Sequence, residues 1–178
     1  MSFTATVEIR SYCGSVVVAD EATWPKAGQQ LLGELKVGRG RLALIAGEAS
    51  AADRLVDRLS SDLELHVARV GAVLAARDHP PTATDVEAVC VSATILTDLD
   101  VFLWPELGIP LLPLLAGIAR HHAVIAVWPG DITDNRARYS TPGRPDYHDS
   151  RLTDVVVLRP RTTRFPDEVP YEIERIAQ

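Results

Sequence analysis

The chain has 178 residues, of which 47% are hydrophobic and 24% charged, and its formal net charge at pH 7 is -6. These values are typical of one soluble globular domain; they exclude a disordered chain and argue against a uniformly basic nucleic-acid binder. Positive charge is nevertheless concentrated in one stretch, because residues 131–164 hold seven arginines and five aspartates. We therefore predict a single domain over residues 1–178, with an N-terminal extension over 1–40 and an arginine-rich part over 131–178.

The cysteine content and the N-terminal sequence indicate the cellular compartment of the protein. Cys13 and Cys90 have no CxxC or Cys/His spacing around them, so neither a disulfide scaffold nor a zinc site is predicted. The N-terminus has no secretory signal pattern, and a reducing cytoplasm is the simplest compartment. Residues 101–119 are strongly apolar, but Glu106 and three prolines interrupt them, which argues against a membrane span.

The first part of the chain is expected to hold two strands, a helix and a buried central strand. A short apolar run bounded by glycines, residues 42–46, is typical of a central strand covered on both faces. Ser50 is expected to cap the helix that follows, and Leu55, Val56 and Leu59 give that helix an apolar face. The two strands and the first helix are predicted at 5–10, 15–19 and 25–36.

Strands and helices alternate in the middle of the chain, which favours a mainly parallel sheet with right-handed crossovers, that is, a three-layer α/β domain. Further strands are predicted at 63–70, 86–92 and 123–128, and helical segments at 71–77 and 110–120. Beyond Gly130 the sequence becomes polar and rich in arginine. One more apolar run follows at 155–158, and a short closing helix is predicted at 168–177.

The turn after the central strand resembles a phosphate-binding loop. Against the pattern G-x-x-x-x-G-K-[ST], Ala52 replaces the second glycine, Asp53 the lysine and Arg54 the magnesium-binding hydroxyl residue. Two like charges about 4 Å apart repel by about 4 kcal/mol at an effective dielectric near 20, so Asp53 disfavours phosphate. We expect an ordinary strand-to-helix turn, and the alternative is weak nucleotide binding without efficient hydrolysis. The candidate nucleotide-binding residues are Gly47, Glu48, Ala49, Ser50, Ala51, Ala52, Asp53 and Arg54.

A P-loop enzyme also needs an acidic residue at the end of a second apolar strand, to hold magnesium through water. In the predicted strand 86–92, that position is Ser92. Both groups that the chemistry requires are therefore replaced, and no catalytic residue is predicted. In the alternative hypothesis of an unconventional ATPase, Arg54 and either Asp98 or Asp100 take over their roles.

The segment after the last predicted parallel strand carries a family resemblance. Trp128-Pro129-Gly130 is followed by Tyr139, Pro142, Gly143, Arg144, Pro145 and Tyr147. With the P-loop-like turn, these motifs resemble BrxF, the small P-loop protein family of type 3 BREX bacteriophage-exclusion systems, over about residues 40–157. The family pattern is tyrosine-x-x-proline-glycine-histidine-proline-x-tyrosine, and Arg144 stands where histidine is usual.

The resemblance implies a P-loop NTPase-like fold and a role in bacterial antiviral defence. It also implies binding to other BREX proteins, such as a larger ATPase, a methyltransferase or a phosphatase-like component. Because Asp53 and Ser92 depart from the family pattern, we expect a degenerate, hydrolysis-deficient member without a resident cofactor or metal. ATP and magnesium binding without hydrolysis is compatible with this expectation, as is homo-oligomerisation.

The arginines and aromatic residues near this segment suit a partner-binding surface, because both residue types concentrate at binding hot spots and α/β sheets place sites beyond their strand ends. A packed surface loop is the plain alternative. A third hypothesis is a DNA-contacting module that uses the same residues with Arg159, Arg161 and Arg164. The partner-binding candidates are Trp128, Arg136, Arg138, Tyr139, Arg144 and Tyr147.

Overall fold

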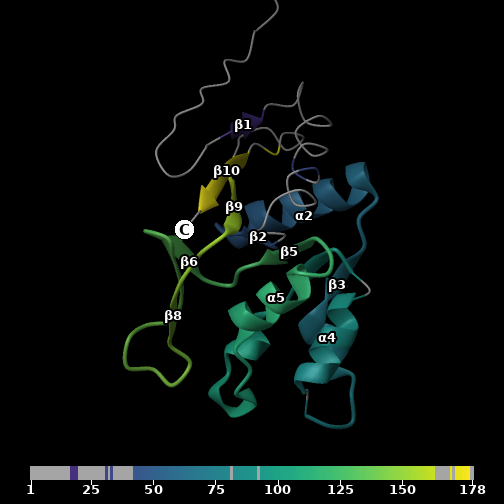
Figure 1. The fold of residues 1–178 in the computed structure, drawn as a ribbon, viewed down its shortest axis with the longest axis vertical. Helices are drawn as coiled ribbons and strands as arrows, with labels where there is room; N and C mark the ends of the chain where they lie inside the picture. The colour runs from purple at the N-terminus through teal and green to yellow at the C-terminus, as the bar shows by residue number, and fades with distance from the viewer. Residues whose placement is uncertain are drawn as a thin grey trace, which may run out of the picture.

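The computed structural model describes residues 17–19, 31, 33, 42–80, 82–91, 93–162, 169 and 171–176. These residues form an α/β fold, in which a mainly parallel seven-stranded sheet is flanked by helices and a small antiparallel sheet lies beside it (Figure 1). The strand order is β1-β10-β9-β2-β5-β4-β3 in the large sheet and β6-β7-β8 in the small one.

The large sheet confirms the prediction of mainly parallel strands. The neighbours β9, β2, β5, β4 and β3 all pair in parallel, whereas β10 runs antiparallel to β9 and β1 antiparallel to β10. The strands are β1 (Val17–Ala19), β2 (Leu42–Ile45), β3 (Val67–Arg69), β4 (Ile95–Thr97), β5 (Val124–Val127), β9 (Val155–Pro160) and β10 (Tyr171–Ile176).

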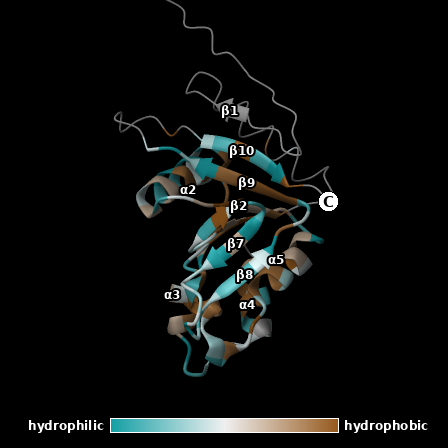
Figure 2. Ribbon diagram, turned by 90° about the vertical axis from the view of Figure 1, so that its left-hand side faces the viewer, coloured by the Kyte–Doolittle hydropathy of each residue, from teal (hydrophilic) through white to brown (hydrophobic). Residues whose placement is uncertain are grey.

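Helices cover both faces of this sheet (Figure 2). On the first face, Ala43 and Ile45 of β2 pack with Leu55 and Leu59 of α2. On the second, Leu44 belongs to the core that includes α3, α4 and α5. The helical elements are α2 (Ala49–Leu63), α3 (Val70–Ala75), α4 (Ala83–Val91), η1 (Asp100–Leu103), η2 (Pro105–Leu107) and α5 (Leu111–Ala119).

The predictions at 42–46, 71–77, 110–120, 123–128 and 155–158 are confirmed as β2, α3, α5, β5 and β9, and β1 lies within the predicted strand 15–19. The apolar face predicted for α2 is also confirmed, since all three of its residues are buried. The strand at 5–10 lies outside the described residues. Of the predicted helix 25–36, only Leu31 and Gly33 are described, and both are helical.

The predicted strand 86–92 is wrong, because this segment is helix α4 up to Val91; Ser92 lies outside the described residues. Val86, Val89 and Cys90 are buried at the i, i+3, i+4 spacing of one helical face. A capping box also begins the helix: the Thr82 amide donates to Asp85 Oδ2 at 2.8 Å, and the Asp85 amide donates to Thr82 Oγ1 at 3.3 Å.

Two further predictions are corrected. The strand expected at 63–70 is only β3, because α2 continues to Leu63. The closing helix expected at 168–177 is instead strand β10. There, Tyr171 and Ile173 alternate with Glu172 and Glu174, and the apolar residues of this period-two pattern are buried.

The small sheet replaces the loop that the sequence suggested after Trp128. Its strands are β6 (Asp131–Thr133), β7 (Arg136–Tyr139) and β8 (His148–Arg151). Asp134 and Asn135 join β6 to β7 with φ values of 53° and 57°. A two-residue connection with both φ values positive matches the twist of a β-hairpin, and Asp and Asn tolerate this conformation best after glycine.

Trp128, at the end of β5, packs against the small sheet and is hydrogen-bonded to it. Its side chain is 2% exposed, and its indole Nε1 donates to the Arg138 carbonyl oxygen at 3.0 Å. The indole also packs on His148 of β8, with ring centroids 5.6 Å apart. Gly130 permits this close approach, because a Cβ there would lie 2.0 Å from the same Arg138 oxygen.

The variant Gly130→Ala tests this junction. We expect its free energy of unfolding to fall by about 2 kcal/mol or more, because the added methyl group forces the backbone of β7 away. Gly33→Ala is the matched control, since a Cβ at that helical glycine meets nothing within 4 Å. Urea denaturation compares the two, and equal midpoints for Gly130→Ala and the unmodified protein would contradict the contact.

His148 gives the junction a pH dependence. Burial lowers the pKa of His148, against a raising effect of Asp149. A histidine whose pKa is lowered by folding contributes stability above its unfolded pKa of about 6.5, and this contribution is lost as the pH falls. We expect a lower urea midpoint at about pH 5.5 than at about pH 7.5, and a smaller difference in His148→Gln.

The carboxylates with lowered pKa values do not contribute to the change in stability between about pH 5.5 and 7.5. Folding lowers the pKa values of Glu48, Asp85, Asp146 and Asp149, so their stabilising effect is lost only as the pH falls below their unfolded values of about 4. An identical pH response in His148→Gln and the unmodified protein would therefore show that His148 is not responsible.

Candidate functional site

The turn between β2 and α2 is three residues long. It consists of Ala46, Gly47 and Glu48, and the helix begins at Ala49. The rest of the candidate set, through Arg54, is therefore helical. Gly47 has a φ of +155°, which favours glycine. This geometry is that of a strand-to-helix turn, and nucleotide binding at it stays a prediction.

Glu48, rather than the predicted Ser50, occupies the N-cap position of α2. Its carboxylate accepts hydrogen bonds from the Ser50 hydroxyl and from Thr162 Oγ1, the latter at 3.2 Å. These bonds, with a smaller effect of the Arg54 charge, lower the pKa of Glu48. An ionised carboxylate thus lies where the helix dipole favours an anion, the place that a nucleotide phosphate needs.

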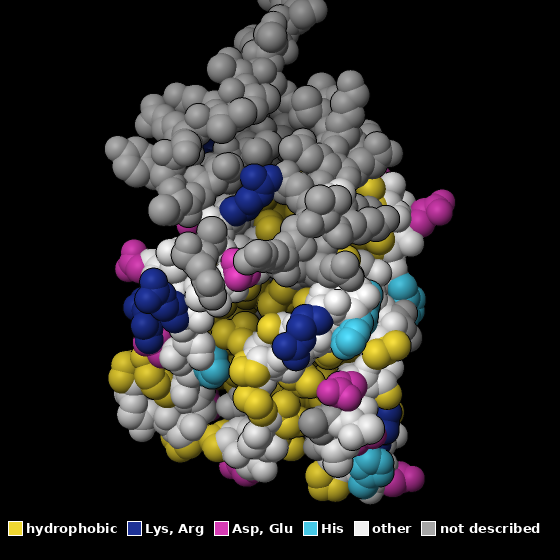
Figure 3. Space-filling model, in the orientation of Figure 1, with side chains coloured by type: hydrophobic (Ala, Val, Ile, Leu, Met, Phe, Trp, Pro, Cys, Tyr) yellow, Lys and Arg dark blue, Asp and Glu magenta, His cyan; other side chains and the backbone are white. Residues whose placement is uncertain are grey.

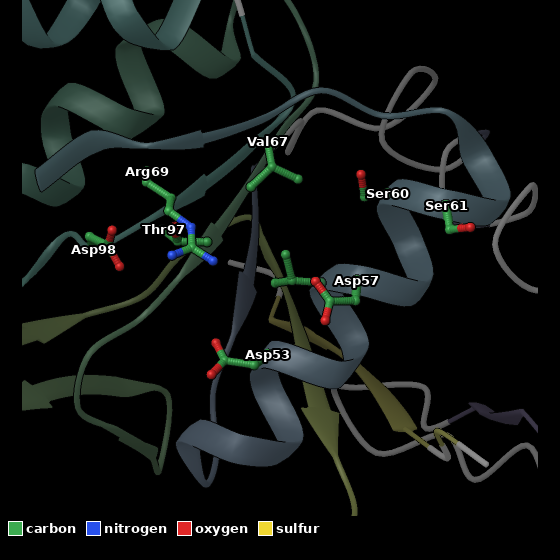
Figure 4. A pocket seen from close by; sticks show the side chains of 9 residues that line it. Asp53, Asp57, Ser60, Ser61, Val67, Arg69, Thr97 and Asp98 are labelled. Atoms are coloured by element: carbon green, nitrogen blue, oxygen red, sulfur yellow. The ribbon is translucent and has the colours of Figure 1, made fainter. Parts of the chain in front are cut away.

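A cavity of about 750 Å³ lies between α2 and the carboxyl ends of β3 and β4 (Figure 4). Asp53 and Asp57 of α2 line one wall, and Arg69 and Asp98 line the other. Three carboxylates and one guanidinium make this cavity acidic. Among the described residues, no group of three His, Cys, Asp or Glu side chains is placed to hold a metal ion.

The structure corrects the position of the acidic strand end. The strand of interest is β4, not the segment ending at Ser92, and Asp98 follows it directly. The φ of Asp98 is +57°, and its carbonyl accepts a hydrogen bond from the Gly71 amide at 3.2 Å. An acidic residue, Asp98, therefore follows a parallel strand of the sheet, whereas the sequence analysis placed this strand end at Ser92. The run Ile95-Leu96-Thr97-Asp98, which has the form of a short strand with an acid at its end, carried the signal.

Two arginines of the small sheet, Arg136 and Arg138, share one carboxylate inside it. Arg136 Nε donates to Asp149 Oδ1 at 2.7 Å, and Arg138 Nε lies 3.6 Å from the same oxygen. Tyr147 OH donates to Asp149 Oδ2 at 3.2 Å. These partners, Arg136 first, lower the pKa of Asp149. Two guanidiniums and one carboxylate leave this cluster with one net positive charge.

The arginines that follow are also paired. Arg159 Nη2 lies 2.9 Å from Glu174 Oε2 across the β9–β10 pair, and Arg161, directly after β9, pairs with Glu172 of β10. Arg164 lies outside the described residues. Cations that are already paired with carboxylates bind nucleic-acid phosphates less well, because the ion pairs must first be broken.

The partner-binding candidates separate into buried and exposed residues. Trp128 is part of the core, so it is not a surface contact, and the half-buried Tyr139 packs against the same core. Arg144 and Tyr147 are exposed on the segment between β7 and β8. The sequence analysis missed Trp104, whose side chain is 54% exposed between η1 and η2. A tryptophan followed by a proline in a loop was the available signal.

No helix formed by the described residues is long and apolar enough to span a membrane. The resemblance to the P-loop protein family rests on the motifs quoted above and stays a prediction. Comparison with protein-family models, with curated proteins and with solved structures found no significant match to this chain.

Proposed function

We propose that this chain is a degenerate P-loop NTPase-like domain that does not hydrolyse nucleotides and acts by binding a partner protein. In line with its resemblance to BrxF, we place it in a BREX-type antiviral defence complex of the bacterial cytoplasm. The observation that carries the loss of activity is the Glu48 carboxylate, which is held at the start of α2 by Ser50 and Thr162.

Charge and geometry at the turn both support this proposal. A phosphate near α2 would meet Glu48 at the start of the helix and then Asp53, one turn further along, where a P-loop enzyme has its lysine. The turn is also only three residues long, which is short for a loop that must surround phosphates with backbone amides. Without the lysine and the longer loop of a P-loop enzyme, the developing charge of phosphoryl transfer loses its usual stabilising groups.

One observation favours the second candidate, an unconventional ATPase. Asp98 stands at the end of β4, as the magnesium-holding acid of a P-loop enzyme does, and lines the same cavity as Asp53. Arg54 would then supply the cation, and its Nη2 is buried without a hydrogen-bond partner among the described residues. The DNA-contacting alternative has less support, because most of its arginines are already paired.

Isothermal titration with ATP and magnesium separates the first two candidates. We expect no saturable ATP binding at millimolar concentration and no phosphate release above the buffer rate. The reason is that the carboxylates of Glu48 and Asp53 lie at the start of α2, where a phosphate would bind. Micromolar binding with phosphate release that Arg54→Ala abolishes would replace the proposal with the ATPase alternative.

The double variant Glu48→Ala/Asp53→Ala tests the cause of the exclusion. With both carboxylates removed, the first turn of α2 can hold an anion, and we expect pyrophosphate affinity to rise about tenfold. Asp57→Ala/Asp62→Ala is the matched control, because it removes two carboxylates from later turns of the same helix. Equal affinities in the double variant and the control would show that the short turn alone excludes phosphate.

A further inference from the structure

A hydrophobic groove of about 250 Å³ lies between two segments that are far apart in the sequence. One side is formed by η1, η2 and the residues that precede α5; the other is formed by Pro145, Tyr147 and His148. Figure 3 shows hydrophobic side chains at the surface around α5 and toward the loop before it. We call this feature the Trp104 groove.

The walls of the Trp104 groove are exposed aromatic rings and prolines. Trp104 is 54% exposed and Tyr147 36% exposed. They are two of only four large hydrophobic residues that are exposed among those the structure describes, and both line this one groove. Exposed aromatic residues that converge on one cavity mark an interaction site rather than a scatter of surface hydrophobics.

The groove is held in shape without a bound partner. Tyr147 donates its hydroxyl proton to Asp149, which Arg136 also holds. In the same loop, Ser140 Oγ and Arg144 Nε donate to Asp146 Oδ1 at 2.9 and 3.1 Å. A preformed binding surface loses little conformational entropy when a partner docks.

The charge around the Trp104 groove is negative. Asp100 at the start of η1 and Glu106 in η2 flank the lining residues, and both are exposed. Within the described part of the chain, neither of them makes an ion pair, whereas the nearby Arg144 is compensated by Asp146. A partner that is complementary to this rim carries positive charge.

We propose that the Trp104 groove binds a proline-containing, basic segment of a partner protein in an extended conformation. Prolines in a polyproline II helix dock between aromatic rings at low entropic cost, because the helix is already formed. A lysine or arginine beside them would lie near Glu106 and over the face of Trp104. This inference rests on the proposed function, in which the chain acts by binding a partner.

Selection from a random displayed peptide library tests the proposal with the full chain as bait. We expect the selected peptides to be enriched in proline and in lysine or arginine. Trp104→Ala should weaken binding of a selected peptide at least about tenfold, the scale of a hot-spot aromatic. Glu106→Lys should remove the preference for basic residues while keeping the preference for proline.

Val91→Ala is the matched control, because Val91 is a large hydrophobic residue, 68% exposed, outside the groove. Its peptide affinity and that of the unmodified protein should agree, and urea denaturation of Trp104→Ala should show an unchanged midpoint. Peptides without proline, peptides that still bind Trp104→Ala, or a library that yields no binder would each overturn the proposal. The ATP titration does not depend on this groove, so the two proposals fail separately.

Discussion

Burial of β2 on both faces is the constraint on which the rest of the structure depends. Leu44 enters the core under α5, while Ala43 and Ile45 enter the core under α2, and all of β2 is buried. A strand that is apolar on both sides can only lie inside a sheet with helices on each face. The turn at Gly47 is consequently brought to the carboxyl edge of the sheet, where α/β proteins place their sites.

The chemistry at that edge is dominated by negative charge. Glu48 fills the start of α2, and Asp53 and Asp98 line the cavity beside it. A phosphate-binding site requires positive charge. The negative charge here agrees with the proposal that the chain keeps a P-loop-like fold but does not hydrolyse nucleotides. Because Asp98 follows β4, the proposed loss of hydrolysis rests on the lysine position, Asp53, and not on the acidic strand end.

In the small antiparallel sheet, an arginine-rich sequence forms an ordered surface whose arginines are partly balanced by aspartates. Asp149 accepts hydrogen bonds from Arg136 and Tyr147, and the Trp128 indole, at the end of β5, donates a hydrogen bond to β7. The same contacts hold the loop that forms one wall of the Trp104 groove. We therefore place partner recognition on this sheet and on the loop before α5, away from the turn that resembles a nucleotide site.

Local periodicity was sufficient to predict β2, β5, α2 and α5, because each has a strong pattern and a clear boundary. It failed for α4, since a short apolar run fits a helix or a strand and only the packing against neighbours decides between them. The predicted acidic strand end was wrong for the same reason, because it was placed after the segment that forms α4. Periodicity failed for β10 because the period-two alternation of Tyr171 and Ile173 with Glu172 and Glu174 was interpreted as a helix. The ion pair between Arg136 and Asp149 joins residues 13 apart in sequence, and strand pairing creates it. The arginine content alone indicated positive charge, but the tertiary structure determined that much of it is paired with carboxylates, because a folded chain pairs charges that the sequence keeps separate.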